Sequence, residues 1–220
     1  MRLAKGAWSH LAVGLVLAVA SVALYATGHE AAGTVVLALG IAVIAFMVYF
    51  FRDPDRPAHP EKDVIVSGAD GWVRQVELIQ DPKYLGVDVV RICTFLTPFD
   101  VHVNRSPIAG KVTKLGYTPG RHFLTIRQEA SDFNEHSSIH IDGPLIRCLV
   151  KQIVGPLVRR VVYWLDEGQQ LGQGDRIGIM KFGSRLDLYL PAADVDVVVK
   201  RGDRVFAGIT VVARIKGKGV

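Results

Sequence analysis

Three residue types that could cooperate in nucleophilic chemistry occur in separate parts of this chain. Gly183-Ser184 supplies a hydroxyl, His102 an imidazole that titrates near neutral pH, and Asp70 a carboxylate. A hydroxyl becomes a strong nucleophile when a base takes its proton, and the base works best when a third group fixes its tautomer. Taken singly, each has an ordinary structural explanation, since Ser after Gly and Asp before Gly are common in turns.

Six short motifs surround these residues and occur in one order along the chain. They are Phe50-Phe51-Arg52-Asp53-Pro54, Ser67-Gly68-Ala69-Asp70-Gly71, Phe99-Asp100-Val101-His102-Val103-Asn104-Arg105-Ser106-Pro107, Asn134-Glu135, Lys151-Gln152-Ile153-Val154-Gly155 and Lys181-Phe182-Gly183-Ser184-Arg185. With this ordered set, the chain resembles the short form of the phosphatidylserine decarboxylases, a family of pyruvoyl-dependent membrane enzymes. The resemblance covers nearly all of the chain after residue 50.

The resemblance implies that the chain is a precursor that cleaves itself between Gly183 and Ser184. The Ser184 hydroxyl would attack the preceding carbonyl, and elimination would then leave a pyruvoyl group made from Ser184. Gly183 suits the attack because it has no Cβ and tolerates a strained backbone. The resemblance assigns His102 as the base and Asp70 as the group that orients it. The two pieces would remain together as a heterodimer, and assembly of such heterodimers into a higher oligomer is an alternative that the sequence does not decide.

The implied cofactor is this covalent pyruvoyl group, whose ketone reacts with an amine and acts as an electron sink when carbon dioxide leaves. The implied reaction is decarboxylation of phosphatidylserine to phosphatidylethanolamine. A related serine lipid with an archaeal-type ether backbone, archaetidylserine, stays open as the substrate. The lipid phosphate needs cations or N–H donors. Candidates for that role are Arg105, Lys151 and Arg185.

One position departs from the longer members of the family. They carry a second histidine three residues before the one that matches His102, and this chain has Phe99 there. A proton donor assigned to that histidine therefore cannot be transferred. The alternatives are His102 acting twice, a water molecule, or another histidine, for which the candidates are His122, His136 and His140.

Two long apolar runs near the N-terminus predict a membrane anchor. Residues 11–26 and 35–51 contain no Asp, Glu, Lys or Arg, and with their polar flanks each approaches the length needed to span a bilayer. The short turn between them lacks Lys and Arg, whereas Arg2, Lys5, Arg52 and Arg56 lie outside the hairpin. The positive-inside rule then places both ends in the cytoplasm and the catalytic domain at the inner face of the cell membrane. A buried helix pair in a soluble core is the alternative.

Composition supports a membrane rather than a nucleic acid as partner. The net charge is +5, half of the residues are hydrophobic, and no zinc-finger, helix-turn-helix or RNP-like motif occurs. Cys93 and Cys148 are isolated in apolar stretches and are expected to be reduced, buried core residues. The seven histidines show no metal-ligand spacing, so no metal is expected.

The sequence predicts three parts: a two-helix anchor at 1–51, a Pro-rich linker at 52–62 and an all-β catalytic domain at 63–220. The fold class is mainly β, with a sandwich or partly closed barrel of the barrel-sandwich-hybrid type after the helical hairpin. A faint repeat supports it, because Gly71-Trp72-Val73 recurs as Gly110-Lys111-Val112 and Gly174-Asp175-Arg176-Ile177 as Gly202-Asp203-Arg204-Val205. Short strands are predicted at 64–66, 72–78, 87–95, 110–117, 123–128, 138–141, 145–154, 158–164, 176–181, 186–190, 196–199 and 210–215.

A competing hypothesis is a membrane-tethered carrier module of the biotinyl or lipoyl type. Met180-Lys181 in a strand-turn setting resembles the biotinyl attachment motif, and Lys181 would then carry the group. The residues that follow, Phe182-Gly183-Ser184, depart from the apolar surroundings of a carrier lysine. A mass increase on Lys181 would support this hypothesis.

Overall fold

The computed structural model describes residues 2–80, 83–125, 129–156, 161–180 and 184–217. The chain divides into two compact units, Met1–Asp55 and Arg56–Val220. The boundary between them falls inside the predicted linker 52–62.

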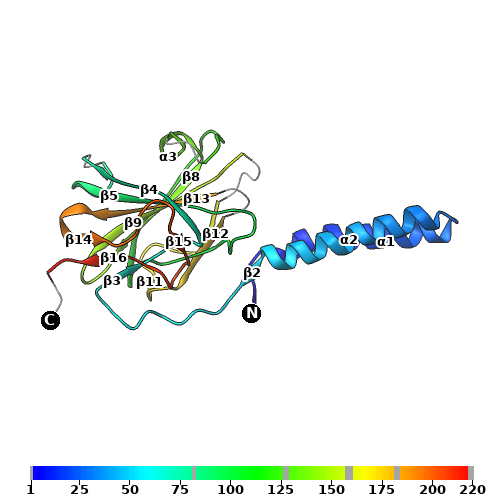
Figure 1. Ribbon diagram of the computed structural model, residues 1–220, viewed down its shortest axis with the longest axis horizontal. Coiled ribbons are helices and arrows are strands. Elements are labelled where there is room, and N and C mark those ends of the chain that lie inside the picture. The colour runs from blue at the N-terminus through cyan, green and yellow to red at the C-terminus, as the bar shows by residue number, and fades with distance from the viewer. Residues whose placement is uncertain (1, 81–82, 126–128, 157–160, 181–183, 218–220) are drawn as a thin grey trace. The chain divides into compact units, whose positions relative to one another are not determined.

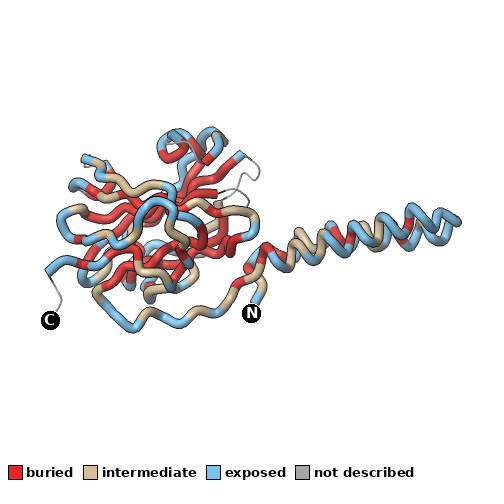
Figure 2. Tube along the Cα trace, viewed as in Figure 1, coloured by how far each residue is buried: buried red, intermediate tan, exposed pale blue. Residues whose placement is uncertain are grey.

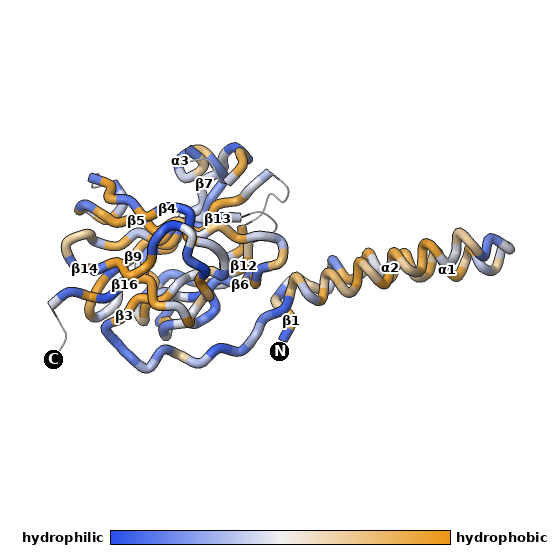
Figure 3. The backbone as a smooth tube through the Cα atoms, in the orientation of Figure 1, coloured by the Kyte–Doolittle hydropathy of each residue, from blue (hydrophilic) through white to orange (hydrophobic). Residues whose placement is uncertain are grey.

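The first unit is a helical hairpin. Helix α1 (Ala7–Ala26) packs against α2 (Glu30–Phe50), and both are hydrophobic along their length (Figure 3). Each is long and apolar enough to cross a membrane. At the open end, β1 (Arg2–Leu3) pairs antiparallel with β2 (Arg52–Asp53). The first two residues of the predicted linker therefore form a short strand.

Small residues let the two helices approach closely. A Cβ on Gly14 would lie 2.3 Å from Ile44 Cγ1, and one on Gly40 would lie 3.2 Å from the Gly14 carbonyl oxygen. Interfaces of this kind are typical of helix pairs in membranes, where close backbone contact replaces the hydrophobic effect.

The second unit is built around an eight-stranded antiparallel sheet in the order β11-β7-β8-β9-β13-β5-β4-β15 (Figure 1). Its strands are β4 (Gly71–Ile79), β5 (Val89–Phe95), β7 (Gly110–Thr118), β8 (His136–Asp142), β9 (Arg147–Ile153), β11 (Gln170–Leu171), β13 (Arg185–Pro191) and β15 (Arg204–Val205).

Two three-stranded sheets complete the unit. One has the order β10-β12-β6 and the other β14-β16-β3. Their strands are β3 (Val64–Val66), β6 (Val103–Arg105), β10 (Val161–Tyr163), β12 (Arg176–Met180), β14 (Val195–Val197) and β16 (Val211–Ile215). The main apolar core takes side chains from all three sheets, and the buried part of the chain is concentrated in this unit (Figure 2). The predicted mainly β class is therefore confirmed.

Turns of one construction explain the faint sequence repeat. In residues 166–169 and 200–203 the third residue is a glycine with φ 88° and 97°, and the fourth side chain accepts the N–H of the first. The glycine N–H of these turns donates to Val112 O and Val73 O, respectively. Strands β11 and β15 follow and pair with the matching ends of β7 and β4. A third turn, residues 172–175, has the same side-chain bond.

Several local features were predicted wrongly or missed, among them the two-residue strands β11 and β15. Residues 123–125 form no strand, and the rest of the predicted strand 123–128 lies outside the described residues. A short helix, α3 (Ala130–Phe133), and a 3-10 turn (Ala192–Asp194) were not expected. Strand β6 was also missed, because its three residues include two polar ones that are buried by tertiary contacts.

Candidate functional site

Ser184 lies at the start of a central strand of the large sheet. It directly precedes β13, is fully buried, and its carbonyl oxygen accepts the Leu96 N–H at 3.0 Å. Gly183 and Lys181 lie outside the described residues. The strand before this gap, β12, belongs to a different sheet from β13. The described strands on either side of the proposed cleavage point therefore belong to different sheets.

His102 lies beside the segment that leads to Ser184. It is fully buried before β6, and its carbonyl oxygen accepts the N–H of Met180 at 3.2 Å, the last described residue before the gap. Its ring Nδ1 lies 2.9 Å from the Asp100 carbonyl oxygen. Because a carbonyl only accepts, Nδ1 carries the proton and the lone pair of the neutral ring is on Nε2. This is the tautomer that a general base needs.

The Asp100 segment that fixes His102 is itself held by side-chain contacts. The Asp100 carboxylate accepts from the Thr97 N–H and hydroxyl, both at 2.7 Å, and pairs with Arg204. Burial raises the pKa of Asp100, but the Arg204 and Thr97 contacts outweigh it, so the pKa falls below its usual value. A charged Asp100 therefore anchors the carbonyl that sets the His102 tautomer.

Asp70 has a different partner from the predicted one. Arg56 donates Nη1 to Oδ1 at 2.6 Å and Nη2 to Oδ2 at 2.9 Å, and the Ala207 N–H donates to Oδ1 at 2.8 Å. No hydrogen bond joins Asp70 to His102 in the described part of the chain. The role of Asp70 in orienting His102 stays a prediction. In this structure the Asp100 carbonyl holds the ring nitrogen.

Backbones approach so closely beside Asp70 that only glycine fits. Gly71 has φ 151°, and a Cβ there would lie 2.1 Å from the Phe95 carbonyl oxygen. The Gly68 carbonyl accepts the Arg105 N–H at 2.9 Å, and a Cβ on Gly68 would be 3.2 Å from Leu186 Cδ2. The segment that carries Asp70 thus packs against β5, β6 and β13, and two of the sequence motifs meet there.

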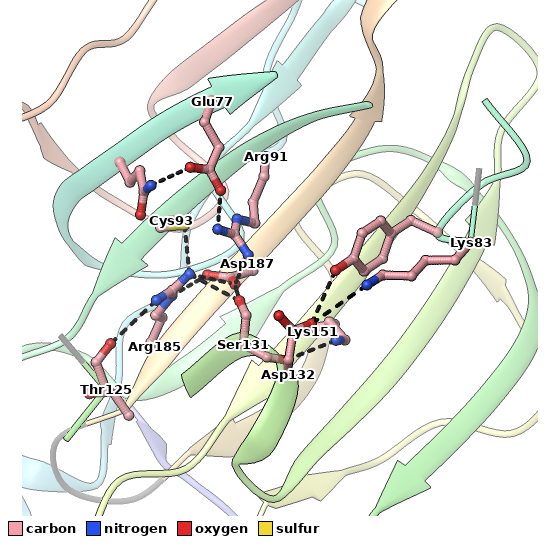
Figure 4. Close-up of polar contacts among 12 residues, drawn as sticks. Glu77, Lys83, Arg91, Cys93, Thr125, Ser131, Asp132, Lys151, Arg185 and Asp187 are labelled. Atoms are coloured by element: carbon pink, nitrogen blue, oxygen red, sulfur yellow. Dashed lines mark hydrogen bonds and ion pairs between the residues drawn. The ribbon is translucent and has the colours of Figure 1, made fainter. Parts of the chain in front are cut away.

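The three predicted phosphate-binding side chains are buried with protein partners. Arg105 donates to Gly174 O at 2.9 Å and Lys151 donates to Ser131 O at 3.0 Å. Arg185 makes a two-point contact with Asp187, at 2.5 and 2.8 Å (Figure 4). Because of these contacts, each of the three has a structural role whatever else it binds.

Arg185 belongs to a charged network on the outer face of the large sheet, covered in part by α3. Asp187 accepts from Ser131 and lies near Arg91, which pairs with Glu77 (Figure 4). Burial alone lowers the pKa of Arg185, but Asp187 more than offsets it and the pKa rises. Burial likewise raises the pKa of Cys93, which receives an Arg185 N–H at 2.9 Å.

A cleft opens next to this network. It has a volume of about 630 Å³ and is lined by Phe95, Thr125, Arg185 and two further arginines, Arg74 and Arg201, among others. Arg74 and Arg201 are exposed, so they can meet an anion from solvent. Sequence reasoning did not single them out, since arginines on strands and turns are usually solvated.

Two contacts of the site were also missed. Arg56 was assigned to the linker, yet its side chain is 7% exposed and bound to Asp70. His122 and Glu135 form a pair, with Nε2 and Oε2 3.1 Å apart. The sequence named His122 as a candidate proton donor and Asn134-Glu135 as a motif, but it gave no signal that the two side chains pair. In the described ranges, no cluster of His, Cys, Asp and Glu side chains could hold a metal ion.

Comparison with known proteins places these residues in context. A family model described as phosphatidylserine decarboxylase matches residues 43–213. The chain is 40% identical to a phosphatidylserine decarboxylase proenzyme of Symbiobacterium thermophilum, over 92% of both chains. It is 42% identical to the same-named protein of Carboxydothermus hydrogenoformans, over 78% of this chain and 81% of that one. It is 43% identical to that of Salinibacter ruber, over 81% and 80%.

Proposed function

The chain belongs to the phosphatidylserine decarboxylase family, and we propose that it is a self-processing enzyme that converts phosphatidylserine to phosphatidylethanolamine and carbon dioxide. The observation that carries the proposal is the position of His102. Its ring has the tautomer of a general base, and its backbone is bonded to the strand that leads to Ser184.

Self-cleavage begins when His102 takes the proton of the Ser184 hydroxyl at Nε2. The oxygen then attacks the Gly183 carbonyl carbon, and the peptide bond becomes an ester. Removal of a Ser184 α-proton expels the Gly183 carboxylate, and hydrolysis of the resulting dehydroalanine releases ammonia and leaves the pyruvoyl group. Burial of Ser184 and His102 fits this chemistry, because a site that excludes water protects the ester from premature hydrolysis.

The pyruvoyl group, once formed, supplies a ketone that accepts the substrate amine and the electron pair left by carbon dioxide. Ser184 would hold the group at the first residue of the new chain.

The two chains should stay associated after cleavage. Strand β13 is paired along its length with β5 on one side and β9 on the other, and β12 is paired with β6 and β10. The cut would fall between strands that are each held by both neighbours. The C-terminal chain would therefore remain an integral part of the core.

The hairpin supports attachment to the membrane that holds the substrate. Both helices have the length and composition to span a bilayer, and the basic residues Arg2, Lys5 and Arg52 flank its open end. We place this end and the catalytic unit at the cytoplasmic face of the cell membrane. Restricting the enzyme to the membrane would reduce the search for a lipid headgroup to two dimensions.

The proposal is tested with three proteins purified in detergent: wild type, Ser184→Ala and His102→Ala. We expect wild type to consist of two chains and to release carbon dioxide from phosphatidylserine, and both variants to stay uncut and inactive. Detection of a cleaved Ser184→Ala chain would rule out the mechanism. An ether-linked serine lipid offered in parallel distinguishes the alternative substrate, and normal processing of His102→Ala would remove His102 as the base.

A further inference from the structure

A decarboxylase needs an acid as well as a base, because the substrate carbon that loses carbon dioxide must receive a proton. Glu135 is a buried acid that self-cleavage does not use. Its residue is 8% exposed, and in the described part of the chain its Oε1 has no hydrogen-bond partner. Its other oxygen, Oε2, lies 3.1 Å from His122 Nε2. A buried carboxyl oxygen without a hydrogen-bond partner is uncommon in folded proteins, and a catalytic role is one explanation.

Glu135 lies in the same cross-strand row as Ser184. Strand pairing places Arg185 opposite Ile153, and Ile153 opposite His136. One residue further along, Val154 therefore lies between Ser184 and Glu135, and the Val154 N–H donates to the Glu135 carbonyl at 3.1 Å. Two strand spacings separate Ser184 from Glu135, about 9.5 Å between their Cα atoms.

Residues in one row point to the same face of a sheet, whereas successive residues point to opposite faces. Ser184 and Glu135 thus share the face of Leu96, which belongs to the apolar core between the sheets. His136 lies in the row of Arg185 and faces the other side. His140 lies four residues further along β8. Of the histidines left open by the sequence, His122 is the one joined to this row.

The backbone around His122 is built to hold it against Glu135. Asn134 Oδ1 accepts the Phe123 N–H at 3.0 Å, while its Nδ2 donates to Phe123 O at 2.8 Å and Val154 O at 2.9 Å. The Glu135 N–H donates to Arg121 O at 3.0 Å. The residues before and after His122 are therefore both hydrogen-bonded to Asn134 or Glu135, which gives the Asn134-Glu135 motif a physical role.

We propose that Glu135 is the acid that protonates the substrate carbon after decarboxylation, and that His122 then reprotonates the Glu135 carboxylate. The proton leaves Oε1 for the carbon, and the carboxylate then takes a proton at Oε2 from His122 Nε2. Rotation of the carboxyl group about its Cγ–Cδ bond brings the protonated oxygen to the substrate for the next turnover. The His122 side chain is 24% exposed and regains its proton from water. Each turnover thus consumes one proton from solvent, and no oxidant or reductant is needed. This inference rests on the proposed decarboxylase function.

The test compares Glu135→Gln and His122→Gln with wild type in full-length protein. We expect both variants to cleave into two chains, because Ser184 and His102 are untouched. Turnover of Glu135→Gln should fall by roughly 10²–10⁴-fold, the usual contribution of a general acid, and that of His122→Gln by less. The controls are Glu167→Gln, whose Oε1 accepts the Leu115 N–H at an exposed site, and His140→Gln, both with wild-type turnover expected.

Two readouts separate a missing proton donor from a loosened structure. In heavy water, wild type should place deuterium on one face of the ethanolamine carbon, and Glu135→Gln should lose this stereoselectivity. Protonation of the pyruvoyl-derived carbon instead of the substrate carbon would also leave the C-terminal chain with an alanyl N-terminus. Edman degradation detects this free N-terminus, whereas a pyruvoyl-blocked chain gives no sequence.

Several results would overturn the proposal. Wild-type turnover or retained stereoselectivity in Glu135→Gln would do so, as would failure of a folded Glu135→Gln precursor to cleave, since the residue would then act before decarboxylation. If Glu135→Gln does not fold, His122→Gln decides by turnover, and wild-type turnover in that variant would overturn the proposal. Failure of the proposed function is distinguished by the wild type itself, which would remain a single chain.

Discussion

The buried ion pair between Arg56 and Asp70 leads to a prediction about stability that the sequence alone would not suggest. Arg56 comes from a Pro-rich segment, yet its guanidinium makes two contacts with Asp70, at 2.6 and 2.9 Å, and a third with Ala207 O at 2.6 Å. The exposed fractions of the two side chains are 7% and 4%. The perturbation is Arg56→Met, which keeps the length of the side chain and removes its charge.

The expected cost follows from burial. Removing one member of a buried ion pair leaves the other charge without compensation and costs about 3–5 kcal/mol of unfolding free energy. Arg214 offers a matched control, because it contacts Glu61 at the same 2.6 Å while the two side chains are 49% and 47% exposed. Exposed pairs contribute about 0–1 kcal/mol. Arg214→Met should therefore cost several-fold less than Arg56→Met.

The assay is urea unfolding of full-length protein in the uncut Ser184→Ala background, so that every sample is a single chain. Adding Asp70→Asn to Arg56→Met should recover part of the loss, because it removes the unpaired buried charge. Equal losses of unfolding free energy for Arg56→Met and Arg214→Met would show that burial does not set the cost of breaking the ion pair. A further loss of stability when Asp70→Asn is added to Arg56→Met would contradict it as well.

Three further predictions concern single residues. Gly71→Ala should lower the unfolding free energy by more than about 1 kcal/mol, because its Cβ would collide with Phe95 O, and by more than Gly202→Ala, which has φ 97° but open space around it; urea unfolding compares them. Cys93 should not react with a thiol reagent in the folded protein at neutral pH, since burial raises its pKa, whereas it should react on unfolding. Burial lowers the pKa of Lys151 in the folded protein. Between this lowered pKa and the unfolded value of about 10.4, the unfolded chain binds more protons than the folded one, so the unfolding free energy rises with pH. Lys151→Met should flatten this rise in unfolding curves measured across alkaline pH.

The strands of the β unit were largely predictable because each has a local pattern. Runs such as Val64–Val66 and Arg147–Ile153 are apolar or alternating and end at turn residues, and the hairpin helices are marked by their length and lack of charge. Strand β6 could not be found this way. Asn104 and Arg105 read as polar loop residues, and their burial depends on Gln152 and Gly174, which are distant in sequence.

In the candidate site, too, residues in local motifs were predictable and their distant partners were not. The ordered motifs singled out Ser184, His102 and Asp70. They did not indicate that Asp70 forms an ion pair with an arginine of the linker, or that the His102 ring bonds to the carbonyl of Asp100. Backbone carbonyls and distant cations leave no local signature, so contacts of this kind emerge only from the fold.

The pairing of His122 with Glu135 has the same origin. It depends on a close approach of two loop segments, where a Cβ on Gly120 would lie 2.5 Å from the Phe133 carbonyl oxygen. In place of the missing acid, the sequence offered His102, a water molecule or one of His122, His136 and His140. The strand register adds what residue type could not give: His136 and His140 lie within β8, whereas His122 pairs with Glu135.

Intact-protein mass spectrometry of the detergent-purified protein tests self-processing directly. We expect two chains separated between Gly183 and Ser184, with the smaller one blocked by a pyruvoyl group at its N-terminus. A single full-length mass in well-folded, membrane-extracted protein would contradict self-processing, and with it the assignment of Ser184 as the source of the cofactor.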